Sequence, residues 1–172
     1  MNERATEARW INAVIWVGAG SFFFALVVSA IFDPTIRLLH FLQALIYVAV
    51  VFLARRKSPW GFGAGVLIAA FWNYINLFVN TFIAAGMRQL VGLVTTGRLR
   101  RPDLLIALVA AGGHFLLIAG CAVGFLRTRP RLPDWARFVA GGVLSIAYLV
   151  AIIATTGQQY MPLLMRVFRI SG

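Results

Sequence analysis

Three asparagines stand close together in an otherwise apolar part of the sequence. Asn73, Asn76 and Asn80 have i, i+3 and i+7 spacing within residues 60–86, so a helix would carry all three carboxamides on one face. A carboxamide without a hydrogen-bond partner is strongly unfavourable in hydrocarbon. We therefore expect this face to point toward protein, water or a ligand.

A second row of polar residues precedes the asparagines. His40, Gln43 and Tyr47 repeat the same spacing in the apolar segment 35–54. The short link between the two segments predicts antiparallel neighbours, which would bring both rows to one depth. His114 and Tyr148, on later segments, are expected to reach that layer too. The sequence thus predicts a ligand-binding polar pocket inside the membrane, formed by Asn73, Asn76, Asn80, His40, Gln43, Tyr47, His114 and Tyr148.

Two other interpretations of these polar residues remain open. Amide, hydroxyl and imidazole groups also hydrogen-bond one transmembrane helix to another, and the protein would then be a structural subunit of a membrane complex. His40 and His114 lie on different segments, as paired axial ligands of a b-type haem do, and the same imidazoles could hydrogen-bond a quinone. A redox membrane subunit is therefore the main alternative to a binding protein.

The residues that most enzymes use are not grouped in this sequence. The five acidic residues fall near the N-terminus or at the edges of apolar segments, namely Glu3, Glu7, Asp33, Asp103 and Asp134. The apolar segments therefore supply no carboxylates for a proton relay or for a divalent-metal centre within the membrane. Cys121 has no nearby base, and Ser145 has no acidic partner for a hydrolytic triad. We expect no catalytic residues and no metal site, which favours a non-enzymatic protein.

The composition places these residues in a membrane. The chain has 172 residues, of which 61% are hydrophobic and only 12% charged, and its mean hydropathy is +0.86. A helical span takes about 20 residues. We predict an all-α integral membrane protein, a bundle of about five transmembrane helices with short arginine-rich loops, in which residues 1–172 form one membrane-embedded domain. The expected spans are 10–32, 35–54, 59–86, 104–126 and 135–156.

Two segments are expected to lie on the membrane surface. The apolar piece 90–94 is too short to cross and stands among arginines. The tail 158–172 mixes apolar residues with arginines after Pro162, which predicts a C-terminal interfacial helix. The third span is long enough to be tilted or broken.

The basic residues lie mainly between the apolar segments. The chain has 16 Lys and Arg against five Asp and Glu, for a net charge of +11. This distribution indicates contact with anionic lipid headgroups and not with nucleic acid. Trp10, Trp60 and Trp135 would begin the first, third and fifth spans on one side, which supports an odd number of spans. A small excess of basic residues on that side predicts a cytoplasmic N-terminus in a multi-pass protein of a bacterial-type inner membrane.

Together these features predict the binding, or the passage, of a small uncharged or weakly polar molecule. No convincing inverted repeat is visible, and an odd number of spans does not suit a lone alternating-access transporter. We therefore expect a homo-oligomer, or a subunit that assembles with other membrane proteins.

Overall fold

The fold is a bundle of α-helices. The computed structural model describes the backbone of residues 3–169 and the side chains of residues 9–167. Its α-helices are α1 (Glu3–Phe32), α2 (Arg37–Arg55), α3 (Pro59–Tyr74), α4 (Phe82–Thr96), α5 (Ile106–Arg127), α6 (Leu132–Thr156) and α7 (Met161–Arg169). Shorter helical turns join them, namely η1 (Pro34–Ile36), the π-helical η2 (Ile75–Val79), η3 (Pro102–Leu105) and η4 (Gln158–Tyr160). No strand occurs within residues 3–169.

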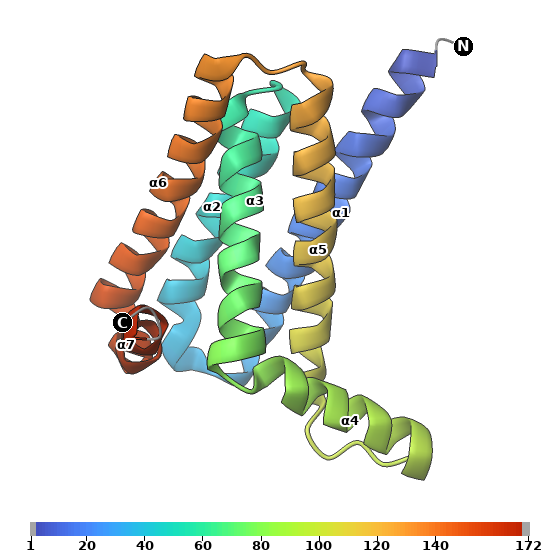
Figure 1. Cartoon of the computed structure of the whole chain (residues 1–172). Coiled ribbons are helices and arrows are strands. Elements are labelled where there is room, and N and C mark those ends of the chain that lie inside the picture. The colour runs from blue at the N-terminus through green and yellow to red at the C-terminus, as the bar shows by residue number, and fades with distance from the viewer. Residues whose placement is uncertain (1–2, 170–172) are drawn as a thin grey trace.

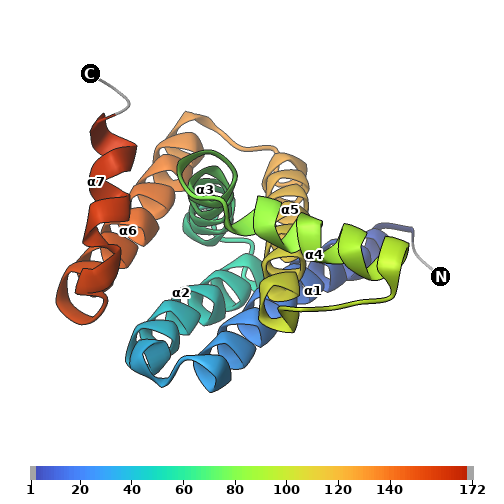
Figure 2. The same ribbon diagram turned by 90° about the horizontal axis from the view of Figure 1, so that it is seen from below.

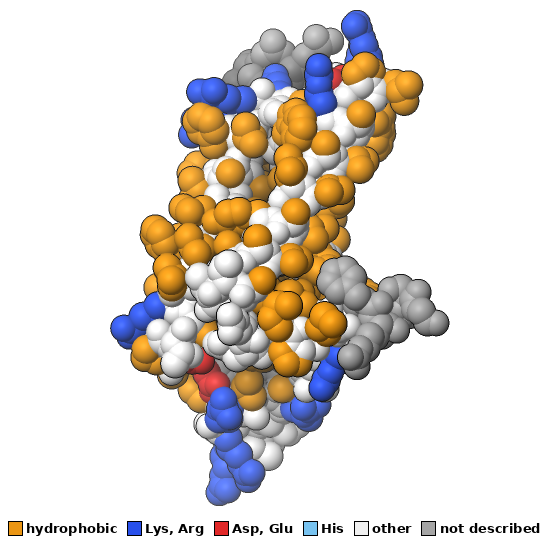
Figure 3. Space-filling view, turned by 90° about the vertical axis from the view of Figure 1, so that its left-hand side faces the viewer, with side chains coloured by type: hydrophobic (Ala, Val, Ile, Leu, Met, Phe, Trp, Pro, Cys, Tyr) orange, Lys and Arg blue, Asp and Glu red, His pale blue; other side chains and the backbone are white. Residues whose placement is uncertain are grey.

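Within the described part of the chain, five helical segments are long and apolar enough to cross a membrane: Arg9–Phe32, Pro34–Arg55, Pro59–Val79, Pro102–Arg127 and Leu132–Thr156. Figure 3 shows a broad band of hydrophobic side chains around the middle of the visible face, with Lys and Arg toward its two ends. The prediction of an all-α, multi-pass membrane bundle is confirmed.

The spans run side by side, and two shorter helices lie at one end of them. α3 occupies the centre, where it packs against α2, α5 and α6, while α1 packs mainly against α5 (Figure 1). α4 leaves the bundle at the end where α7 also lies, and the two helices extend to opposite sides of it (Figure 2). Residues 170–172 of the predicted interfacial tail lie outside the described residues.

The third span ends earlier than the predicted range 59–86. α3 passes into the π-helical η2, and the chain turns sharply at Asn80, whose backbone is extended (φ −119°, ψ 176°), before α4 begins at Phe82. The cause is local: the Asn80 N–H donates to the Ile75 carbonyl (2.9 Å), and the Asn80 Oδ1 accepts from the Phe82 N–H (2.8 Å). An asparagine side chain that binds nearby backbone competes with helix continuation. The short surface piece 90–94 therefore belongs to a longer helix, α4.

Glycines allow the central helices to approach closely. A Cβ atom on Gly63 of α3 would collide with the carbonyl oxygen of Phe138 on α6, and one on Gly141 would collide with the carbonyl oxygen of Trp60. Lipid gives no hydrophobic driving force for helices to associate, so close packing of backbones at small residues stabilises the contact instead. Gly112 on α5 differs, because nothing lies within 4 Å of a Cβ built there.

We expect Gly63→Ala to destabilise the bundle by about 1–3 kcal/mol, because the added methyl group forces α3 and α6 apart. Gly112→Ala is the matched control and should be neutral or stabilising by about 0.5–1 kcal/mol, since alanine favours helix and meets open space. Thermal unfolding in one detergent measures both. Equal effects of the two substitutions would contradict this packing.

Candidate functional site

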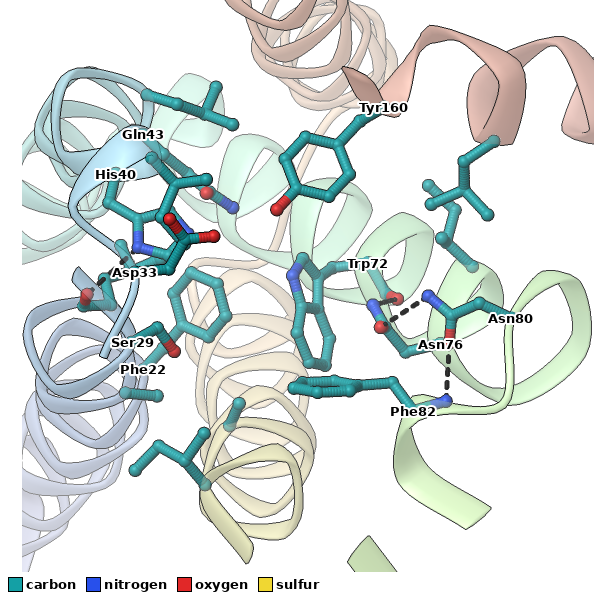
Figure 4. A pocket seen from close by; sticks show the side chains of 18 of the residues that line it. Phe22, Ser29, Asp33, His40, Gln43, Trp72, Asn76, Asn80, Phe82 and Tyr160 are labelled. Carbon is teal, nitrogen blue, oxygen red and sulfur yellow. Dashed lines mark hydrogen bonds between the residues drawn. The ribbon is translucent and has the colours of Figure 1, made fainter. Parts of the chain in front are cut away.

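A cavity of about 790 Å³ lies at the end of the bundle that carries α4 and α7. Side chains from all five spans contribute to it, and most of its lining is apolar, including Phe22, Leu26, Leu39, Trp72, Ile106, Leu149 and Leu164. Polar groups interrupt this lining at Ser29, Asp33, His40, Gln43, Asn76, Asn80, Thr81, Arg101, Asp103 and Tyr160. Figure 4 labels seven of them, namely Ser29, Asp33, His40, Gln43, Asn76, Asn80 and Tyr160. The volume falls within the range of about 300–1,000 Å³ that is typical of small-molecule sites.

Gln43 is the most deeply buried polar residue of the cavity lining. It is 5% exposed, yet its carboxamide has no hydrogen-bond partner among the residues that the structure describes. Figure 4 shows the amide pointing toward the Tyr160 hydroxyl across the cavity. Burial, and secondly the negative charge of Asp33, raise the pKa of Tyr160, so the hydroxyl keeps its proton at neutral pH. Gln43 and Tyr160 therefore both present hydrogen-bond donors to the cavity.

His40 links the first two spans at the cavity wall. Its Nδ1 lies 3.0 Å from the Leu26 carbonyl oxygen, and because a carbonyl only accepts, Nδ1 carries the proton. The other ring nitrogen of the neutral imidazole is then an acceptor. Asp33 lies at the start of the same span, where hydrogen bonds from the Thr35 hydroxyl (2.6 Å) and the Thr35 N–H (3.0 Å) lower the pKa of the Asp33 carboxyl. The carboxylate is therefore ionised at neutral pH.

Asn76 and Asn80 line the cavity but are largely occupied by their own segment. Asn76 Nδ2 donates to the Trp72 carbonyl (2.9 Å), Asn80 Nδ2 donates to Asn76 Oδ1 (2.9 Å), and Asn80 Oδ1 caps α4 at Phe82. This chain of bonds satisfies backbone groups freed by the π-helical turn, as backbone irregularity inside a membrane requires. The two asparagines thus form part of the cavity wall, but most of their hydrogen-bonding groups are already used within their own segment.

Asn80→Ala should destabilise the protein by about 0.5–2 kcal/mol, the usual loss for a helix cap, because Phe82 N–H and Asn76 Oδ1 both lose their partner. Asn80→Asp keeps the acceptor for Phe82 and should lose less. Thermal unfolding of the two variants in detergent gives the comparison. An alanine variant as stable as the parent protein would show that the turn does not depend on this cap.

Tyr47 and His114 form a separate, fully buried pair. The Tyr47 hydroxyl and His114 Nε2 share a hydrogen bond of 2.7 Å, and His114 has 0% exposure. The imidazole packs against the rings of Phe22 (centroids 4.1 Å apart) and Trp72 (4.8 Å). Both of these rings also line the cavity, so they separate His114 from it.

The structure therefore brings four of the eight predicted pocket residues together at the cavity, namely His40, Gln43, Asn76 and Asn80. Tyr47 and His114 pair with each other, and Tyr148 donates to the Leu42 carbonyl (3.1 Å) from an exposed position. Asn73 is buried, with no hydrogen-bond partner for either side-chain atom, and is not part of the lining. His40 and Gln43 thus meet Asn76 and Asn80 at the cavity, as expected, whereas Tyr47 and Asn73, deeper in the two rows, do not join them.

The two histidines do not fit the alternative of a b-type haem held between them. His40 lines the cavity, whereas His114 is enclosed by Phe22 and Trp72 with its Nε2 bound by Tyr47. A haem with two histidine ligands needs both imidazoles to face one open space, and only His40 faces the cavity. Among the residues that the structure describes, no three His, Cys, Asp or Glu side chains gather to hold a metal ion.

Tyr160 is the cavity residue that the sequence did not reveal. It follows Gly157 in the short turn η4, which carries the chain from α6 to α7 beneath the bundle. Neither periodicity nor hydropathy marks a tyrosine in such a turn as facing inward. Asp33, Ser29 and Thr81 line the cavity for a similar reason, since each stands where a helix ends or begins.

Tyr47→Phe should lower stability by about 1–2 kcal/mol, because it leaves the buried His114 Nε2 without a partner. In the double variant Tyr47→Phe/His114→Leu the loss should be smaller than the sum of the two single losses, as coupling predicts. Tyr148→Phe is the control, with an exposed hydroxyl and a smaller expected loss. Additive losses in this thermal-unfolding cycle would contradict a stabilising bond.

No protein-family model, no curated protein and no solved structure matches this chain. The geometry of the cavity therefore carries the functional inference.

Proposed function

We propose that this multi-pass membrane protein binds a small uncharged molecule with an apolar body and a hydrogen-bonding head in the cavity beside α4 and α7. The observation that carries this proposal is Gln43, a nearly buried carboxamide that has no partner within the described residues and points into the cavity. The amide is reached only through the cavity, whose lining is mostly apolar. A hydrogen bond between it and a bound molecule would be stronger there than in water.

The wall chemistry suits a hydroxyl, amide or carbonyl head. Gln43 both donates and accepts, Tyr160 donates, and the free ring nitrogen of His40 accepts. A charged head would lose hydration in a lining that is mostly apolar. Arg101 and Asp103, which also line the cavity, are paired with each other, so the ionised Asp33 leaves a net negative charge that disfavours an anion. A quinone belongs to this class, and in this site its carbonyl oxygens would accept from Gln43 and Tyr160 and not from His114.

Binding is favoured over passage. Phe22 and Trp72 close the inner end of the cavity around His114. Beyond them the bundle is filled by side chains with no exposure, such as Val50, Leu117 and Cys121. A route across the membrane would have to separate these residues.

Decan-1-ol and decanamide, which share one apolar chain and differ in their uncharged heads, should raise the unfolding temperature of the detergent-solubilised protein. Decanoate and decylammonium should raise it much less. Saturation at a free concentration 100 times Kd would correspond to about 2.7 kcal/mol. In Gln43→Leu the shift should fall sharply, while the stability of the unliganded protein should stay equal or rise, because an unpaired amide has been removed.

Asn73→Leu is the matched control. Asn73 is another buried carboxamide without a partner, but it does not line the cavity, so its variant should keep the full ligand-induced shift. The proposal fails if neither uncharged probe stabilises the parent protein. It also fails if Gln43→Leu and Asn73→Leu lose the shift equally.

A further inference from the structure

A second hollow, of about 540 Å³, lies away from the cavity, along the outer half of α4. Its wall is formed by α4 and by the segment 97–101 that returns along the helix toward α5 (Figure 1). Arginines dominate the lining, which consists of Arg88, Gln89, Gly92, Thr96, Arg98 and Arg100.

Local structure explains how the arginines come together. Gly97 ends α4 in the left-handed region (φ +66°), its N–H donating to the Leu93 carbonyl (3.0 Å), and this reverses the chain. The returning segment is held by the Arg101 N–H, which donates to Gln89 Oε1 (3.1 Å). Gly92 has no side chain to fill the space, and a Cβ built there would meet only the Arg98 carbonyl oxygen, at 3.7 Å. Arg98 and Arg100 are thereby held beside Arg88.

The three guanidinium groups have no negative partner among residues 9–167, whose side chains the structure describes. Arg88, Arg98 and Arg100 make no ion pair or hydrogen bond with the residues that the structure describes. The one acid nearby in the sequence, Asp103, is already bound to Arg101 in a two-point pair (2.9 and 2.5 Å). Three like charges around one hollow repel each other, and a bound anion relieves that repulsion.

The position of α4 suits an anion at the membrane surface. α4 lies at the end of the spans and points away from the bundle (Figures 1 and 2). It exposes the apolar side chains of Met87, Val91 and Val94 as well as its arginine. Such a helix settles at the boundary between acyl chains and headgroups, where lipid phosphates stand.

We propose that the hollow formed by Arg88, Arg98 and Arg100 binds a phosphate group. The planar fork of a guanidinium matches two phosphate oxygens, which is why arginine serves widely in phosphate recognition. The phosphate comes either from an anionic phospholipid headgroup or from a soluble phosphate. This site is separate from the proposed cavity ligand, and neither proposal depends on the other.

Calorimetric titration of the full chain in a neutral detergent tests this site. The probes are dioctanoyl phosphatidylglycerol, dioctanoyl phosphatidylcholine and inorganic phosphate. We expect saturable binding of at least one phosphate probe, and a loss of affinity of about tenfold or more in the variant Arg88→Gln/Arg98→Gln/Arg100→Gln. These side chains are exposed and their charges repel each other, so the variant should unfold at the same temperature as the parent protein or a higher one.

A charge-matched control separates a site from net charge. Arg9→Gln/Lys57→Gln/Arg129→Gln also removes three positive charges, from exposed positions outside the hollow, and should change the affinity less than twofold. Phosphatidylglycerol binding without competition from inorganic phosphate would identify a lipid as the source, whereas competition would identify a soluble phosphate. Equal losses in the two triple variants, or no saturable binding of any probe, would overturn the proposal.

Discussion

The bond from the Phe82 N–H to the Asn80 carboxamide determines the shape of this end of the molecule. Inside a membrane a helix has no water to satisfy a broken backbone, so it ends only where side chains or a lined cavity supply partners. Asn76 and Asn80 supply them, and α4 therefore starts in a new direction beside the bundle. If residues 75–86 continued α3 as a straight helix, α4 would extend along the bundle axis and would not lie across this end. The cavity wall and the arginine hollow both follow from that turn.

Much of the fold could be predicted from hydropathy alone. Continuous apolar segments of sufficient length indicate spans, and they begin and end close to the residues expected, for example at Phe32 and Thr156. The end of the third span could not be predicted in this way, because residues 82–86 are as apolar as the helix before them. What ends the helix is the use of two asparagine side chains by nearby backbone, and hydropathy carries no information on that use.

The polar residues show where helical periodicity stops being a guide. Spacing by 3.6 residues places Asn73, Asn76 and Asn80 on one face, but a π-helical turn over Ile75–Val79 changes the angle between successive side chains. Asn73 is consequently separated from the cavity that Asn76 and Asn80 line. For Tyr47 and His114 the limit is different. Spacing indicated that both face inward, as they do, but not that each would be the other's partner.

The candidate site is marked by polar side chains that have no hydrogen-bond partner in a bundle where most polar side chains have one. Most polar side chains within the spans hydrogen-bond to another helix or to their own backbone. Tyr148 and Ser145 do so, and they stabilise the fold without needing a ligand. Gln43 and Asn73 remain unpaired, but only Gln43 faces open volume. α4 also connects this volume to the arginine hollow, because one continuous helix runs from the cavity wall at Phe82 to Arg88 and ends at Thr96. A rigid helix cannot move at one end independently of the other, so a phosphate bound at Arg88 would also restrict the position of the cavity wall at Phe82.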